Sequence, residues 1–462
     1  MLNLIIEVSQ YLLILFFGIY TIQCFESRIP GLREKTRNGI YHRQRLLIYL
    51  IHMIASNLIY IVTDDLRMVL LYAVQFALIT VIQCFFQLFY ENSSRLLTNN
   101  MCMLLVIGFV MITRISPDKA IKQTIIAAIA AMFAFIVPLF IRRVGIVRNL
   151  YPLFGALGLG CLLAVAIAGA ISYGAKLSIS IGGVSFQPAE FVKITFIFFV
   201  AGMLYKDVSF KRICITTVLA AAHVLVLVLS KDLGAALIFF VIYLVMLFVA
   251  SKNVFYILAG TGAGAVAGVV GYYLFSHVRV RVLAWQTPLE VIDKEGYQIC
   301  QSLFAIGTGS WMGLGFYKGE PNKIPVVVQD FIFSAIAEEF GGIFAICLIL
   351  VCLSCFLLFL KISMAISDQF HRLVALGLGT LYGFQVFLTI GGSTNFIPST
   401  GVTLPLVSYG GSSILSSIII FAIIQGLYIL KQDEGHFNER QRAEKQRTEK
   451  NNKKSEKKEA AY

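Results

Sequence analysis

An aspartate stands where a long polar stretch of the chain gives way to an apolar one. Asp330 follows Val326-Val327-Val328-Gln329 and precedes Phe331-Ile332-Phe333. An ionisable side chain at membrane depth costs free energy to keep there, so it is a functional-site hypothesis by default. A carboxylate in such surroundings can accept a proton as a general base or bind a divalent cation. We therefore take Asp330 as the first candidate for a functional site.

A second charged set opens another apolar stretch, in the run Gln187-Pro188-Ala189-Glu190-Phe191-Val192-Lys193. Proline suits the first turn of a helix, where its missing N–H costs nothing. Glu190 and Lys193 are three residues apart and share one helix face. Opposite charges on one face of an apolar helix point toward a partner or a wet cavity. A substrate-binding role and a structural ion pair both fit this pattern.

The stretch 277–330 offers further polar groups. A guanidinium matches phosphate oxygens, which makes Arg279 and Arg281 candidates for phosphate binding, although interfacial snorkelling fits at least one of them better. Apolar residues at 299, 303, 304 and 306 predict a short amphipathic helix on the membrane surface. That helix would present three further candidates for substrate binding: Gln298, Gln301 and Ser302.

Other polar residues have structural readings beside a role in a cavity. Asp232 precedes an apolar run and could cap the following helix. Ser408, Gly410 and Gly411 open the last apolar stretch, where adjacent glycines loosen a helix or pack it closely. No histidine or lysine that could act as a base stands near Ser408, Ser412 or Ser413 in sequence. The six histidines form no metal-ligand pair.

Composition identifies the elements that must position these residues. The chain has 462 residues, of which 58% are hydrophobic and 14% charged, with a mean hydropathy of +0.81. Apolar runs of about 20 residues predict an all-α polytopic membrane protein rather than a barrel. The net charge of +13 resides in short loops and the tail, which indicates topology and not nucleic-acid binding. We expect about thirteen spans, at 3–24, 45–63, 67–90, 100–114, 119–141, 149–172, 187–205, 212–230, 233–250, 254–276, 331–361, 371–392 and 403–430.

Lysine and arginine predict the orientation of these spans. They concentrate in loops 25–45, 142–148 and 206–212 and in the tail, which places those segments in the cytoplasm. The N-terminus is then outside, the C-terminus inside, and 277–330 is the one large extracellular loop. The basic loop 114–122 argues against this orientation. The tail, 431–462, is expected to be disordered and to be attracted modestly to anionic lipid.

Five motifs together resemble the SEDS family (shape, elongation, division and sporulation proteins), the FtsW, RodA and SpoVE group. They occur in family order: Gln187 to Lys193, Asp232-Leu233-Gly234, Gly296 to Gly309, Asp330 to Gly341, and Pro405 to Ser413. The resemblance implies a ten-helix core at 96–430, after an N-terminal three-helix extension at 1–95. Lys231 and Gln329 stand where the family commonly has Pro and Thr, so the elongation, division or sporulation subgroup stays open.

The resemblance implies a peptidoglycan glycosyltransferase of the bacterial cell membrane that polymerises lipid II. An acceptor hydroxyl attacks the anomeric carbon of the donor, the configuration inverts, and undecaprenyl pyrophosphate leaves. Asp330 matches the family's catalytic aspartate and would act as base, as ligand for Mg²⁺ or Mn²⁺, or as both. Glu190 and Lys193 match a polar pair in the central cavity. Glu338 and Glu339 lie too far along the helix for the same proton, and we expect a structural or cavity role for them.

The resemblance also implies a partner, a class B penicillin-binding protein that acts as transpeptidase. Two other functions stay open from the sequence. Thirteen spans with intramembrane charges also suit a lipid II flippase. A non-enzymatic scaffold of a cell-wall synthesis complex is the third reading.

Overall fold

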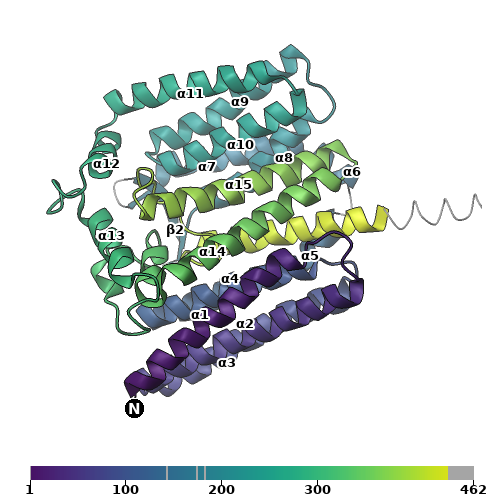
Figure 1. The fold of residues 1–462 in the computed structure, drawn as a ribbon. Helices are drawn as coiled ribbons and strands as arrows, with labels where there is room; N and C mark the ends of the chain where they lie inside the picture. Colours follow the sequence, from purple (N-terminus) through teal and green to yellow (C-terminus); the bar gives the residue numbers. More distant parts are fainter. Residues whose placement is uncertain (1, 142–143, 173–174, 182–183, 435–462) are drawn as a thin grey trace, which may run out of the picture.

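The computed structural model describes residues 2–141, 144–172, 175–181 and 184–434, and it is built of α-helices with one small sheet (Figure 1), which confirms the all-α class. The long helices are α1 (Leu2–Glu26), α2 (Glu34–Thr63), α3 (Leu66–Phe89), α4 (Arg95–Ile115), α5 (Pro117–Ile141), α7 (Tyr151–Ala168), α8 (Ala189–Leu204), α9 (Phe210–Leu229), α10 (Leu233–Ser251), α11 (Val254–Leu274), α14 (Ile332–Ala365), α15 (Gln369–Ser393) and a last helix, Gly411–Glu434. The short ones are α6 (Val144–Asn149), α12 (Ser276–Gln286), α13 (Tyr297–Gly309) and the 3-10 turn η1 (Pro321–Lys323).

Within the described residues, 12 helices are long and apolar enough to cross a membrane, and each overlaps an expected span. The remaining expected span, 187–205, corresponds to α8, which has 16 residues. That length reaches about 24 Å, less than a typical bilayer core needs. Nearly all of α8 is buried, among α7, α9, α10 and α15. An interior helix has no lipid face to match, so its shortness costs little.

The helices lie roughly side by side as layers (Figure 1). α4 is buried along the whole of its apolar stretch, whereas α11, at one edge, has no buried residue. Helices α1 to α3 lie at the opposite edge, where α1 packs on α14 and α2 packs on α4. The division into an extension at 1–95 and a core at 96–430 stays a prediction.

The expected long loop is largely structured. Its segments α12 and α13 stand at one end of the helix bundle, the end at which the chain starts, and the last helix runs out at the other end (Figure 1). The helix expected near residues 299–306 is present as α13. Three short antiparallel strands, which the sequence did not suggest, precede α8: β1 (Ala170–Ser172), β2 (Ala175–Ile181) and β3 (Val184–Phe186), in the order β1-β2-β3.

The last expected span, 403–430, has different limits in the structure at both of its ends. The last helix starts at Gly411 and not at residue 403, because the backbone of residues 399–410 turns beside the loop that carries Asp330. It also continues to Glu434, past the expected start of the tail. The remainder of the expected disordered tail, 435–462, lies outside the described residues.

Helix α14 is interrupted at Gly341, where φ is +86° and ψ is 172°. The backbone groups released at this break pair with residues 310–317, which we call the 310–317 loop. Four hydrogen bonds make the connection: Leu314 N–H to Glu338 O (2.9 Å), Gly315 N–H to Glu339 O (3.1 Å), Gly342 N–H to Ser310 O (2.8 Å) and Ile343 N–H to Trp311 O (3.2 Å). A Cβ on Gly341 would stand 2.3 Å from the Gly313 nitrogen, so the close approach requires glycine.

A candidate active-site cavity

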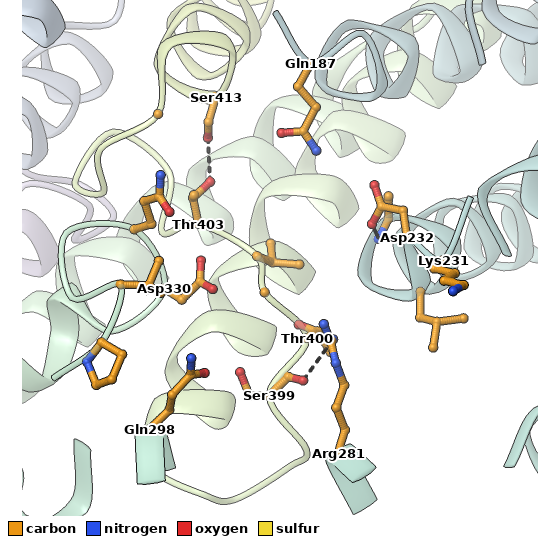
Figure 2. Close-up of a pocket in the computed structure, with 18 of the residues that line it drawn as sticks. Gln187, Lys231, Asp232, Arg281, Gln298, Asp330, Ser399, Thr400, Thr403 and Ser413 are labelled. Carbon is orange, nitrogen blue, oxygen red and sulfur yellow. Dashed lines mark hydrogen bonds between the residues drawn. The ribbon is translucent and has the colours of Figure 1, made fainter. Parts of the chain in front are cut away.

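A cavity of about 1020 Å³ lies among α8, the turn before α10, α12, α13, the loop that ends at Asp330 and residues 399–413, which lead into the last helix. Figure 2 shows side chains from these distant segments pointing into one space. Its polar lining consists of Lys122, Ser178, Gln187, Glu190, Lys193, Lys231, Asp232, Arg281, Lys294, Glu295, Tyr297, Gln298, Gln329, Asp330, Ser399, Thr400, Thr403, Tyr409, Ser412 and Ser413. A space of this size and polarity accommodates a large, hydrogen-bonding substrate.

The loop that ends at Asp330 is held in place by the segment before the last helix. The hydroxyl of Ser408 donates to the Gln329 carbonyl oxygen (2.5 Å) and accepts from the Leu404 N–H (2.9 Å). The Tyr409 N–H donates to the Val328 carbonyl oxygen (2.7 Å). Ser408 is buried and does not line the cavity. Its hydrogen bonds hold the backbone next to Asp330.

Asp330 carries the electrostatic signature of a proton acceptor. Burial raises the pKa of its carboxyl group to about 6, against a smaller opposing effect of the Arg281 guanidinium. Both side chains lie within 4 Å of the point that a Cβ on Gly401 would occupy. Arg281 is itself held by donating to the Ser399 carbonyl oxygen (3.1 Å; Figure 2). A base near neutrality with a fixed cation beside it suits proton transfer close to a negatively charged leaving group.

Asp232 faces the same space from the opposite wall (Figure 2). Its carboxylate caps α10 by accepting from the Ala235 N–H (3.1 Å), as the sequence indicated. Burial raises the pKa of Asp232, while that hydrogen bond and the positive charge of Lys193 oppose the rise. Capping fixes the carboxylate in place, which makes Asp232 part of the rigid wall of the cavity.

Glu190 and Lys193 form a buried ion pair at the cavity wall. The Lys193 Nζ donates to Glu190 Oε1 (2.7 Å) and to Gln385 Oε1 (3.3 Å). The other Glu190 oxygen accepts from the Ser416 hydroxyl (3.1 Å). Only 2% of Lys193 is exposed. The pair lines the cavity and also connects α8 to α15 and to the last helix, so the structural and the cavity readings both apply.

The remaining sequence candidates separate into two groups. Gln298, Gly410 and Gly411 line the cavity. Four others do not line it. Arg279 is exposed and Gln301 is partly buried, both outside the cavity. Ser302 is fully buried and hydrogen-bonded to Ser334 and Ser393, and Glu338 belongs to a separate polar cluster at the break in α14. The structure does not bring these four together with Asp330. Ser302 instead joins α13 to α14 and α15.

Several lining residues were missed from the sequence, above all Lys122, Lys231 and Lys294. The signal for Lys231 was its place next to Asp232-Leu233-Gly234. Its φ of +64° is a backbone conformation that proline, the residue expected there, cannot adopt. In the sequence, Lys122 is one of the basic residues of loop 114–122 that argue against the predicted orientation. In the structure it lines the cavity, which accounts for a positive charge at this position.

No group of three or more His, Cys, Asp or Glu side chains lies close enough to hold a metal ion within the part of the chain that the structure describes. Asp330 by itself could supply one carboxylate ligand to a metal ion. Mg²⁺ commonly uses one or two carboxylates together with substrate phosphates and waters, so the lining fits such an ion only with a phosphorylated substrate present.

Comparison with curated proteins finds two kinds of relative. The chain is 38% identical over 267 residues to a protein of Mycobacterium tuberculosis named peptidoglycan glycosyltransferase RodA; these residues are 54% of this chain and 57% of that protein. The chain therefore spans little more than half the length of that relative. It is also 33% identical over 281 residues to the probable peptidoglycan glycosyltransferase FtsW of Geobacter sulfurreducens, covering 58% of this chain and 74% of that one.

Two solved structures share the fold. One comes from a study of the structural coordination of polymerization and crosslinking by a peptidoglycan synthase complex, with a TM-score of 0.63 and 24% identity over 74% of this chain and 98% of that one. The other is the rod shape determining protein RodA of Thermus thermophilus, with a TM-score of 0.56 and 23% identity over 73% of this chain and 96% of that one.

A family model described as cell cycle protein, FtsW, RodA and SpoVE, matches residues 94–432. The match includes all five motifs and every cavity-lining residue. It confirms the resemblance to the SEDS proteins, and it begins just before α4, after the first three helices. The chain therefore belongs to the FtsW/RodA/SpoVE family of cell cycle proteins.

Proposed function

We propose that this protein is a peptidoglycan glycosyltransferase that polymerises lipid II into glycan strands. The observation that carries the proposal is Asp330, a carboxylate with a pKa of about 6 that opens into a large polar cavity beside Arg281. The names of the mycobacterial and Geobacter relatives support the same activity. Processes served by such an enzyme are cell wall biogenesis, cell shape and division.

Asp330 accepts the proton in this reaction. The 4-hydroxyl of the acceptor N-acetylglucosamine attacks the anomeric carbon of the donor N-acetylmuramic acid and passes its proton to the Asp330 carboxylate. The bond between that carbon and the pyrophosphate oxygen breaks, and undecaprenyl pyrophosphate leaves with the electron pair. A β-1,4 bond forms from an α-linked donor, so the configuration inverts. Pyrophosphate needs no protonating acid when cations meet its charge.

The cations of the cavity differ in how much charge they can offer to the leaving group. Lys193 is neutralised by Glu190 at 2.7 Å and is almost fully buried. Arg281 and Lys231 are exposed and line the cavity together. Arg281 donates one hydrogen bond to the Ser399 carbonyl oxygen, and within the described residues its other donors make no hydrogen bond and can meet phosphate oxygens. We assign pyrophosphate binding to these two residues and a supporting role to Lys193.

A divalent ion, Mg²⁺ or Mn²⁺, would be held by Asp330 and the substrate phosphates, and would supply positive charge to the pyrophosphate. The protein's own contribution at that point is to hold the Asp330 carboxylate through the hydrogen bonds of Ser408 and Tyr409 to the preceding residues. An unchanged rate of lipid II polymerisation after chelation of divalent ions with EDTA would show that the reaction needs no such ion.

The membrane setting follows from the same site. Lipid II polymerisation takes place on the outer face of the bacterial cell membrane, so the end of the bundle that carries α12, α13 and Asp330 would be extracellular. The C-terminus would then be cytoplasmic, which agrees with the basic loops. A class B penicillin-binding protein is the proposed partner, and the likeness of fold to a peptidoglycan synthase complex supports it.

The deciding experiment is a polymerisation assay on the purified protein with lipid II, alone and with the cognate transpeptidase. Wild type should form glycan polymer, and Asp330→Asn and Asp330→Ala should not. Glu320→Gln is the matched control, because Glu320 is an exposed carboxylate of the same loop that pairs with Lys323 outside the cavity. Lipid II translocation without polymer would favour a flippase, and full function of cells carrying only Asp330→Ala would favour a scaffold.

A further inference from the structure

The first helix of the chain contacts the 310–317 loop directly. The side-chain amide of Gln10 in α1 donates to the carbonyl oxygens of Met312 and of Gly313, the latter at 3.1 Å. Only 4% of Gln10 is exposed. A buried amide donor is costly to leave unpaired, so this contact specifies one position of the loop relative to α1.

A line of buried aromatic rings connects the same elements. Phe17 of α1 packs on Phe344 of α14, with ring centroids 4.4 Å apart. Phe344 packs on Phe340 at 4.8 Å, and Phe340 packs on Phe316 of the loop at 5.2 Å. Each of these four rings is at most 2% exposed. The rings therefore lie on both sides of the break at Gly341 and join α1, the loop and both segments of α14.

The first segment of α14 is held in part by the 310–317 loop. It runs from Ile332 to Phe340, and the break at Gly341 separates it from the rest of the helix. At its far end the segment pairs with the 310–317 loop through the carbonyls of Glu338 and Glu339. Its near end begins two residues after Asp330. A short helix separated by a break has no continuous hydrogen-bond ladder to hold it, so side contacts decide where it lies.

We propose that α1 is a brace for the active site: through Gln10 and Phe17 it holds the 310–317 loop, and through that loop it holds the α14 segment that positions Asp330. This gives α1, which precedes the family match, a role in positioning the active site. Gln10 is on this view a positioning residue, since it reaches the reaction only through the loop. The proposal goes beyond the glycosyltransferase activity and rests on it only for the kinetic part of its test.

The chain offers a matched control on the same helix. Gln23 also lies in α1 and is 6% exposed, but it makes no hydrogen bond to the 310–317 loop within the described residues. Gln10→Ala removes the brace contact, and Gln10→Glu keeps the size of the side chain while removing its N–H donors. Gln23→Ala perturbs the same helix without touching the loop.

The test measures amide hydrogen exchange of the purified full-length protein in segments 310–317 and 332–340, together with kcat, KM and the pH profile of lipid II polymerisation. Both Gln10 variants should speed exchange in both segments. They should lower kcat by about tenfold with KM within about twofold, because a displaced base costs rate more than binding. They should also move the acidic limb of the pH profile, since Asp330 would sit in a different environment. Gln23→Ala should change none of these.

Two results would overturn the brace. One is unchanged exchange at 332–340 in both Gln10 variants, which would show that the loop does not hold the segment. The other is an equal effect of Gln23→Ala, which would show general loosening of α1. If wild type forms no polymer, the proposed function fails, and the exchange measurement still decides on the brace.

Discussion

Two acids at opposite ends of one short helix segment, Asp330 and Glu339, have opposite surroundings. Glu339 is fully buried and pairs with Arg114 at 2.9 Å, and the Arg114 guanidinium also lies 3.9 Å above the Tyr317 ring. Asp330 makes no ion pair among the described residues and opens into the cavity. Both acids lie in one motif, nine positions apart. The difference indicates that a buried acid paired with a cation has a structural role. A buried acid that faces the cavity without an ion-pair partner remains available for chemistry.

The largest effect should separate the two acids in activity. Asp330→Asn should lower the rate of lipid II polymerisation by about a thousandfold, because the amide cannot accept the acceptor's proton. Glu339→Gln should retain most of the rate. Initial rates of polymer formation measure both. Comparable losses in the two variants would contradict the assignment of Asp330 as the base.

Stability should show the reverse order. Arg114→Met should lower the free energy of unfolding by about 3 kcal/mol, because it leaves the Glu339 carboxylate buried without a partner. The double variant Arg114→Met with Glu339→Leu should recover most of that loss. Thermal unfolding in detergent tests both, with Asp330→Asn as the variant that should not be destabilised. An Arg114→Met protein as stable as wild type would contradict a structural role for the Arg114–Glu339 ion pair.

A smaller effect should distinguish two arginines of α12. Arg281→Gln should reduce kcat/KM by about thirtyfold, the loss expected for one charge-assisted contact with phosphate. Arg279→Gln should stay within about twofold, since Arg279 is exposed and outside the cavity. Steady-state kinetics on the two variants side by side gives the comparison. Equal losses would mean that general positive charge near the membrane, and not the cavity, accounts for the effect.

The smallest effect concerns pH. Since burial places the pKa of Asp330 at about 6, the rate should rise as pH increases through that value and level off above it. Arg281→Gln should move the midpoint upward by less than about one unit, because Arg281 lowers that pKa. The raised pKa also means that the folded state holds this proton more tightly than the unfolded state. Stability should therefore decrease from about pH 4 to 6 in wild type, and less so in Asp330→Asn.

Much of the fold could be predicted from the chain alone. Long apolar runs locate membrane helices because lipid leaves the backbone no other partners, and each of the twelve candidate spans among the described residues overlaps an expected one. The limits of the helices were less accurate. Residues 403–410 belong to an expected span but lie outside the last helix, and Ser408 and Tyr409 bond to the loop before Asp330 instead.

The candidate site could be predicted in part. Asp330, Glu190, Lys193 and Asp232 stood out because charges are rare in apolar surroundings. The sequence correctly predicts that Gln301 and Ser302 lie on a helix, α13. It does not show that both residues lie on a face of α13 away from the cavity. Lys122 and Lys231 gave no such signal, since a lysine at the end of a span is ordinary topology.

The sequence by itself determined the class of protein, the family and the acid most worth testing, because hydropathy and five ordered motifs are local properties of the chain. Only the tertiary structure decided which charges share a cavity, which acid has a partner, and what α1 touches. Residues such as Gln10 and Met312 are 302 positions apart, and no local pattern connects them. Their contact exists because α14 breaks at Gly341 and the released backbone takes a loop as its partner.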